Sequence, residues 1–415
     1  MDTSKPIEVT VHKDINIYVF KKGNGSIAAV WTPLKDPVRI QVGMPKDVTG
    51  YDLMGNVIPN LVKNRDSLII TNSPIFLTSG LSNTGFASKL SKAECFLPEV
   101  RADARLRSTD TADLYLSNLT SHALGVNVQL PSAWKKRQMH ATIPANGSLV
   151  LPIHAAGDFL PGKKTNVSCK IVTSGNSVTT INKDIITYPA KRATEKVVVD
   201  GDLSEYRDIA PIVMDSPKWI YPSGGDAVAN KLWAGPDDLS MRVWLTWDES
   251  NFYFAARVKY GRFIQDSEGP SIWNGDGFQI AFDTESDAVA SYVSGAGGGY
   301  GDDDYEYGLA LTKSGPQGFC WHAASKNSTM AGRLTDFAPV IKRVDEHTLN
   351  YEWAIPWSNL YPLKPVPGKA FGFNLSHPLH PNKPGEVYKY WMGLGMGITG
   401  GEKNPCIFPT FFLTR

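Results

Sequence analysis

The chain has 415 residues, which is too many for one typical hydrophobic core, so about two to four domains are expected. Lys and Arg total 42 and Asp and Glu total 41, a net charge of +1, so the charge balance excludes nucleic acid and anionic membranes as expected partners. Glycine (37), proline (28) and aromatic residues (11%) favour β-sheet with many turns, and the chain is predicted to be all-β.

Residues 1–90 are predicted to form a β-sandwich. The segment 15–20 alternates apolar and polar residues, a Gly-containing turn follows, and 26–31 supplies the hairpin partner. Further strands are expected at 38–42 and 67–71. The stretches YVFKKGNGSIAAVW, VTGYDLMGN and SLIITNSPIFL resemble the β-sandwich that trails the catalytic barrel in several glycoside hydrolase clans. That resemblance implies an accessory role.

Residues 91–192 are predicted to form a second β-sandwich with the strand rhythm of immunoglobulin-like domains. Strands are expected at 109–118, 126–130 and 149–153. This part holds no cluster of acidic, histidine or aromatic residues, so a spacer role is expected. The polar segment 189–196 is predicted to be a linker and marks a domain boundary.

Residues 193–415 are predicted to form a third domain, in which the central feature is a tryptophan before an alternating strand. Trp273 lies in a polar, Gly-containing loop, and 278–283 follows as a strand. Phe278, Ile280 and Phe282 would fill the core, while Gln279 and its neighbours on the other face would meet a ligand. A flat ring beside amide and carboxylate groups suits a sugar. A buried tryptophan and an ordinary edge strand are the alternative interpretation.

The order of motifs in this third domain resembles that of the family 9 carbohydrate-binding modules and their DOMON relatives. The motifs are VDGDLSEY, VWLTWDESNFYFAARV, IWNGDGFQIAFD, DDDYEYGLAL, YEWAIPW and FGFNL. Three tandem β-sandwich domains are therefore expected, 1–90, 91–192 and 193–415.

The family resemblance implies a cleft with two stacking aromatic rings and polar groups for a terminal sugar. Trp273 matches the first stacking tryptophan, and Gly308 stands where the family carries an arginine. Glu402 stands where the second stacking tryptophan would be, so Trp391, Trp321 or Tyr300 is the candidate for a second platform. The predicted ligand-binding residues are Trp273, Gln279, Tyr300, Glu306, Trp391 and Glu402.

The resemblance also implies structural calcium. Calcium requires several hard oxygen ligands, and two acidic turns could supply them. The alternative is a solvated acidic turn. The predicted metal ligands are Asp200, Asp202, Asp302, Asp303 and Asp304.

Four cysteines, Cys95, Cys169, Cys320 and Cys406, form no CxxC pair, so no zinc or redox motif is present. Disulfides and free thiols both remain open. A DOMON relative could instead bind haem for electron transfer, with His380, Met392 and Met396 as the residues to consider.

The sequence thus predicts non-catalytic binding of a polysaccharide or oligosaccharide. The chain would be the C-terminal targeting region of a secreted bacterial glycoside hydrolase, extracellular or at the cell surface, with a catalytic domain upstream in the full precursor. A polysaccharide-degrading enzyme with its active site on a sandwich face is the alternative, although no motif of a catalytic barrel, nucleophile elbow or zinc protease is present.

Overall fold

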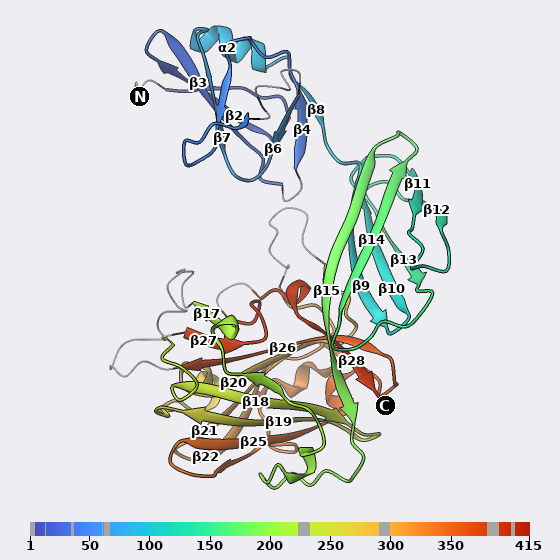
Figure 1. Ribbon diagram of the computed structural model, residues 1–415, viewed down its shortest axis with the longest axis vertical. Helices are drawn as coiled ribbons and strands as arrows, with labels where there is room; N and C mark the ends of the chain where they lie inside the picture. The colour runs from blue at the N-terminus through green and yellow to red at the C-terminus, as the bar shows by residue number, and fades with distance from the viewer. Residues whose placement is uncertain are drawn as a thin grey trace.

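The computed structural model describes residues 5–12, 14–34, 37–59, 61, 67–222, 233–289, 299–379, 390–399 and 403–415. Its regular structure is almost entirely β-strand, which confirms the all-β prediction. Three large hydrophobic cores follow one another along the chain. The ribbon correspondingly divides into three parts along the chain (Figure 1). We call the parts around them the N-terminal unit (7–96), the middle unit (100–192) and the C-terminal unit (193–415). Within the described residues, no helix is both long and apolar enough to span a membrane.

The N-terminal unit consists of two small sheets with one helix against them. One sheet has the order β1-β2-β3-β7-β5 and the other β6-β4-β8. The last of these strands extends the unit beyond residue 90, where the sequence predicts its end. The elements are β1 (Ile7–Glu8), β2 (Asn16–Lys22), β3 (Gly25–Trp31), β4 (Val38–Gln41), β5 (Thr49–Tyr51), β6 (Ser67–Ile70), β7 (Ile75–Ser79), α2 (Asn83–Leu90) and β8 (Glu94–Phe96).

The helix α2 was not expected from the sequence. The Ser82 hydroxyl caps it by accepting a hydrogen bond from the Gly85 amide at 3.2 Å. Phe86, Ala87 and Leu90 then lie on one helical face and pack into the core of the N-terminal unit. A serine cap followed by apolar residues at helical spacing is the local reason for this helix.

The middle unit packs the sheet β13-β10-β9 against β12, β11, β14 and β15. β14 and β15 are long and form a hairpin that rises along one side of the unit (Figure 1). The elements are β9 (Val100–Ser108), β10 (Thr111–Asn118), β11 (Leu124–Gln129), β12 (Gln138–Ile143), β13 (Ser148–His154), β14 (Lys164–Thr173) and β15 (Val178–Arg192).

The C-terminal unit places the strands β16-β18-β19-β25-β24 over the strands β23-β22-β21-β20-β26-β27-β17, with an aromatic core between them. The 197–199 segment, which precedes the acidic turn at 200–202, is irregular. The strands are β16 (Ile212–Met214), β17 (Ile220–Pro222), β18 (Leu239–Trp247), β19 (Asn251–Tyr260), β20 (Phe278–Asp283), β21 (Asp304–Thr312), β22 (Gly315–His322), β23 (Gly332–Arg333), β24 (Val340–Arg343), β25 (Thr348–Pro356), β26 (Ala370–Leu379), β27 (Tyr390–Gly393) and β28 (Thr410–Thr414). Short 3-10 helices are η1 (Ser204–Tyr206), η2 (Pro217–Trp219), η5 (Gly269–Asn274), η6 (Ser325–Met330), η7 (Trp357–Leu360) and η8 (Pro405–Ile407).

The middle and C-terminal units are joined by paired backbone rather than by a free linker. β15 runs to Arg192 and pairs in parallel with β28 and then with β18. Ala370 and Phe412 of the C-terminal unit lie in the core of the middle unit. The first half of the predicted linker, 189–192, is therefore strand, because its backbone groups are hydrogen-bonded across the junction.

The four cysteines are free thiols, of which Cys95 is half-buried and the others are buried. Of the two options left open by the sequence, the structure therefore has free thiols. Cores of this size do not require covalent cross-links.

Candidate functional site

The strand predicted to carry the binding residues has the expected alternation. Phe278, Ile280 and Phe282 on β20 point into the aromatic core of the C-terminal unit. Gln279 therefore lies on the opposite face, which we call the outer face. Direct cross-strand pairing places Gly308 of β21 and Ser376 of β26 on either side of Gln279. The outer face thus joins three strands that are far apart in sequence.

Two side chains in the centre of the outer face have polar atoms that no described residue partners. Gln279 is 8% exposed and Ser376 is 2% exposed. Gln279 Oε1 and Ser376 Oγ are buried, and neither has a hydrogen-bond partner among the described residues. An unpartnered buried polar atom costs about 1–3 kcal/mol, so two adjacent ones indicate a place where a ligand or water binds.

A charged pair lies beside these two residues. Glu306 on β21 is directly opposite Ala281 of β20, on the same outer face, and is 4% exposed. Lys403 Nζ lies 2.8 Å from Glu306 Oε1 and also donates to the Ile398 carbonyl at 2.6 Å. This salt bridge holds the segment before η8 against the outer face.

Tyr300 lies next to this pair. Its ring stacks on His322 with 4.9 Å between the ring centroids, and the ammonium of Lys403 lies 5.9 Å from the ring. The hydroxyl oxygen is buried and faces the Glu306 carboxylate, although it makes no hydrogen bond of normal geometry within the described part of the chain. Burial, together with the negative charge of Glu306, raises the pKa of Tyr300 well above its usual value. Tyr300 therefore keeps its proton and can donate a hydrogen bond.

Three tryptophans border the outer face. Trp273 belongs to η5 and is 43% exposed, whereas Trp391 on β27 is only 9% exposed. Trp321 on β22 is half-buried, and its indole nitrogen donates to the Pro270 carbonyl at 2.9 Å. Each ring is thus placed by a different element, so these rings can offer stacking surfaces in different directions.

Gly308 explains the position of Trp321. A Cβ atom at residue 308 would lie 2.2 Å from Cη2 and 2.7 Å from Cζ3 of the Trp321 ring. Any larger residue at 308 would clash with the indole. Only glycine therefore lets the six-membered ring of Trp321 pack against the sheet backbone beside Gln279. The sequence names Trp321 only as an alternative platform, and a glycine within an alternating strand is the signal that marks it.

A second candidate site is a group of five carboxylates at the end of β20 and the start of β21. Oxygens of Asp283, Asp303 and Asp304 lie within 4.8 Å of one another, as do oxygens of Glu285, Asp287 and Asp303. Asp304 is 2% exposed, and its Oδ1 has no partner within the described residues. We call these five residues the carboxylate cluster.

The carboxylate cluster is unfavourable without a counter-charge. Burial first, and then the neighbouring negative charges, raise the pKa of Asp283 to about 6, that of Asp287 to about 7 and that of Asp304 to about 8. Converging hard oxygens at this spacing fit the ligand preference of calcium. The cluster is therefore the better candidate for a metal centre than either acidic turn alone.

The predicted metal ligands separate into two places. Asp303 and Asp304 belong to the carboxylate cluster, but the Asp302 carboxylate accepts a hydrogen bond from the Ser325 hydroxyl at 2.7 Å. Asp200 and Asp202 lie in another turn, whose backbone amides at 200 and 201 donate to the buried Glu352 at 2.9 Å each. Neither group of converging oxygens in the cluster includes these three residues, and the sequence did not indicate Asp283, Glu285 or Asp287 as ligands.

Two predicted residues, Glu402 and His380, lie outside the described residues. The methionines named for haem differ in setting. Met392 is fully buried in the core, whereas Met396 is 41% exposed.

Comparison with known proteins gives structural likeness only. No protein-family model matches the sequence, and no curated protein matches it either. A family 9 carbohydrate-binding module from Caldicellulosiruptor kristjanssonii, solved with cellotriose, is 15% identical over 55% of this chain and 93% of its own, with a TM-score of 0.38. A family 9 module from the same organism, solved with glucose, is also 15% identical, over 55% of this chain and 96% of its own, with a TM-score of 0.37. A Bacteroides uniformis protein, provisionally named as carbohydrate-binding, is 12% identical over 54% and 97%, with a TM-score of 0.31. The function is therefore inferred from the side chains of the outer face.

Proposed function

We propose that the C-terminal unit binds a polysaccharide or oligosaccharide on its outer face. The observation that carries this proposal is the adjacent pair of buried atoms, Gln279 Oε1 and Ser376 Oγ, that have no partner among the residues the structure describes. A sugar hydroxyl can both donate and accept, so it would supply the missing bond to each atom. Burying polar atoms without partners is costly in a fold but useful in a binding site.

The groups beside Gln279 and Ser376 suit neutral hydroxyls rather than a charged ligand. Glu306 and Lys403 neutralise each other, with 2.8 Å between the ammonium and the carboxylate. Tyr300 adds a protonated hydroxyl, and Gln279 adds an amide. A set of donors and acceptors without excess charge matches the hydroxyls of a sugar ring.

The tryptophans would supply the apolar contact. Sugar rings present C–H groups on their faces, and these stack on indole rings. Trp321, placed over Gly308 beside Gln279, would be one platform, and the more exposed Trp273 would meet a neighbouring residue of the glycan. Trp391 lies on the other flank of the outer face.

We propose a calcium ion for the carboxylate cluster. Asp283, Asp303 and Asp304 would hold it, and Glu285 and Asp287 would complete the negative site. The ion would neutralise buried carboxylates and so stabilise the unit, without taking part in chemistry. A calorimetric titration with calcium, of protein that has first been stripped of calcium with a chelator, tests this directly. Absence of any heat or thermal shift would refute it.

The wider role is proposed from the motif resemblances. The chain would be the non-catalytic region of a secreted polysaccharide-degrading enzyme, holding substrate near an upstream catalytic domain and so raising its effective concentration. Turnover of insoluble polysaccharide by the complete precursor should then fall when the C-terminal unit is deleted, while turnover of a short soluble substrate should not.

Affinity electrophoresis is the test of glycan binding. The full chain should be retarded in gels that contain one of xylan, glucan, mannan or galactan, and calcium should be present in one set of gels and chelated in the other. Trp321→Ala should remove the retardation, whereas Trp134→Phe, a conservative change in the core of the middle unit, should retain it. A wild-type chain that is retarded in none of the gels would contradict the proposal.

A further inference from the structure

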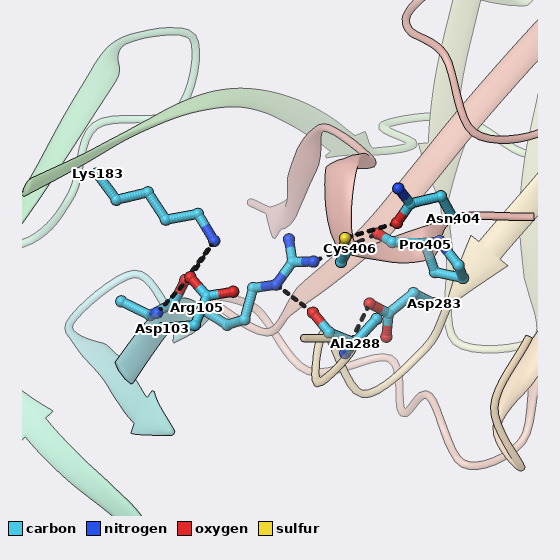
Figure 2. A network of polar contacts seen from close by, with 9 residues as sticks. Asp103, Arg105, Lys183, Asp283, Ala288, Asn404, Pro405 and Cys406 are labelled. Carbon is cyan, nitrogen blue, oxygen red and sulfur yellow. Dashed lines mark hydrogen bonds and ion pairs between the residues drawn. The ribbon is translucent and has the colours of Figure 1, made fainter. Parts of the chain in front are cut away.

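One arginine of the middle unit enters the C-terminal unit at the loop that carries the cluster. Arg105 lies on β9 and is only 5% exposed. Its Nε donates to the Ala288 carbonyl at 2.6 Å, and its Nη2 donates to the Pro405 carbonyl at 3.4 Å (Figure 2). A single guanidinium therefore holds the loop after β20 and the start of η8 together.

The same loop is fixed from its other side by a member of the carboxylate cluster. Asp283 Oδ1 accepts from the Asp287 amide at 3.1 Å, and Asp283 Oδ2 accepts from the Ala288 amide at 3.3 Å. Ala288 thus donates to a cluster carboxylate through its N–H and accepts from Arg105 through its carbonyl. Glu285 and Asp287 lie between these anchors, so the position of their carboxylates depends on both.

The charge of Arg105 acts on the cluster as well as on its neighbour Asp103. Asp103, two residues before it on β9, is already bonded to Lys183 at 2.6 Å (Figure 2). Arg105 itself donates to carbonyl groups, and its charge acts favourably on Asp283 and Asp287. Five carboxylates exceed the charge of one divalent cation, so they can accommodate the cation and the guanidinium together.

Docking of the two units does not depend on Arg105 alone. The Thr109 amide donates to the Gly368 carbonyl at 2.9 Å, and Phe412 packs into the core of the middle unit. Replacement of Arg105 should therefore leave the units in place and release only the loop. This separates an effect on the cation site from a general loss of the junction.

We propose that the cation site is shared between two units, with Arg105 of the middle unit as the positioning residue that holds the 283–288 loop in its cation-binding form. The proposal rests on the calcium site proposed above. By linkage, the cation then strengthens the same contact between the units that Arg105 makes. The C-terminal unit alone would have an incomplete site.

Calcium titration of three full-length proteins tests this proposal. We expect Arg105→Met to weaken calcium binding about tenfold, which is typical for coupled sites. Arg105→Lys, which keeps the charge and can reach one carbonyl, should recover part of the affinity. Arg107→Met is the matched control, because Arg107 lies on the same strand and pairs at 2.6 Å with Asp113 inside the middle unit. It should bind calcium as the wild type does.

The outcomes separate this inference from the proposed site itself. Equal calcium affinity in the wild type and in Arg105→Met would overturn the shared site and leave the calcium site standing. No calcium binding by the wild type would overturn both. The thermal midpoint of each variant in chelator reports folding: a midpoint lowered equally in Arg105→Met and Arg107→Met, with calcium affinity unchanged, would show a structural role only.

Discussion

Gln279 on β20 and Ser376 on β26 face each other directly across the sheet, and each carries a buried polar atom without a partner among the described residues. If the fold gains nothing from these atoms, removing them should not weaken it. We expect Gln279→Leu combined with Ser376→Ala to leave the free energy of unfolding unchanged or to raise it by about 1–2 kcal/mol. Urea unfolding followed by tryptophan fluorescence measures this.

Asn374 provides the contrast for that experiment. It lies two residues before Ser376, and its amide donates to the carbonyls of Gly395 and Met396 at 3.2 and 2.8 Å. Asn374→Ala should therefore lower the free energy of unfolding by about 1–3 kcal/mol. A loss of the same size in the double variant would show that the Gln279 and Ser376 atoms are bonded within the fold.

Adding one methyl group at Gly308 should displace Trp321. The new Cβ would lie 2.2 Å from the ring, so the indole must move, at a cost of about 1–3 kcal/mol. We expect Gly308→Ala to shift the tryptophan emission and to weaken glycan binding. Gly157→Ala, where no atom lies within 4 Å of the added Cβ, should do neither. Unchanged glycan affinity in Gly308→Ala would remove Trp321 from the binding surface.

The carboxylate cluster predicts a pH dependence of the cation-free protein. The pKa of Asp304 rises from 3.8 to about 8 on folding, so between these values the folded state retains a proton that the unfolded chain releases. Stability should therefore fall as the pH rises from about 4 to about 8 in chelator, and calcium should restore it. Asp304→Asn should remove this part of the dependence and raise the stability at pH 8 by about 1–3 kcal/mol. A wild type whose stability in chelator is the same from about pH 4 to about pH 8 would contradict this prediction.

His377 predicts a pH dependence of the opposite sign. The residue is fully buried, its Nδ1 donates to the Pro378 carbonyl at 2.9 Å, and its Nε2 accepts from the Tyr260 hydroxyl at 3.0 Å. Burial lowers the pKa of His377 from 6.5 to about 3, so below pH 6.5 the unfolded chain binds a proton that the folded protein does not. Stability should be lost as the pH falls from about 6.5 toward about 3, by at most about 1.4 kcal/mol per pH unit.

The His377 contribution is isolated by difference. Unfolding of the wild type and of His377→Gln should be compared at several pH values in calcium, with the exposed His347→Gln as control. The wild type and the control should lose stability more steeply than His377→Gln on acidification. Parallel curves for all three proteins would show that His377 titrates alike in the folded and unfolded states.

Local pattern predicted the strands of the C-terminal unit well. The strand expected at 278–283 agrees with β20 because strict alternation fixes both the strand and its core face. The helix α2 was missed because it is short and its cap, Ser82, resembles a turn residue in a chain rich in turns.

The sites were predictable only in part because their members are far apart in sequence. Gln279 was found on its own strand, but Ser376 is brought to it by β26 pairing, and Lys403 reaches Glu306 across 97 positions. Three consecutive acids also cannot all point the same way. The Asp302 carboxylate accepts a hydrogen bond from Ser325, while the carboxylates of Asp303 and Asp304 lie close to those of the 283–287 segment. The three acidic residues within that short segment were a sequence signal that the prediction did not use.

The most direct test of the central claim is a calorimetric titration of the wild type and of Gln279→Leu with an oligosaccharide of the glycan that retards the chain. Gln138→Leu, a change at an exposed position on β12, is the control. We expect the wild type and the control to bind alike and Gln279→Leu to bind about five- to 150-fold more weakly, since a missing hydrogen bond to a buried group costs about 1–3 kcal/mol. Equal affinity in all three proteins would contradict sugar binding on the outer face.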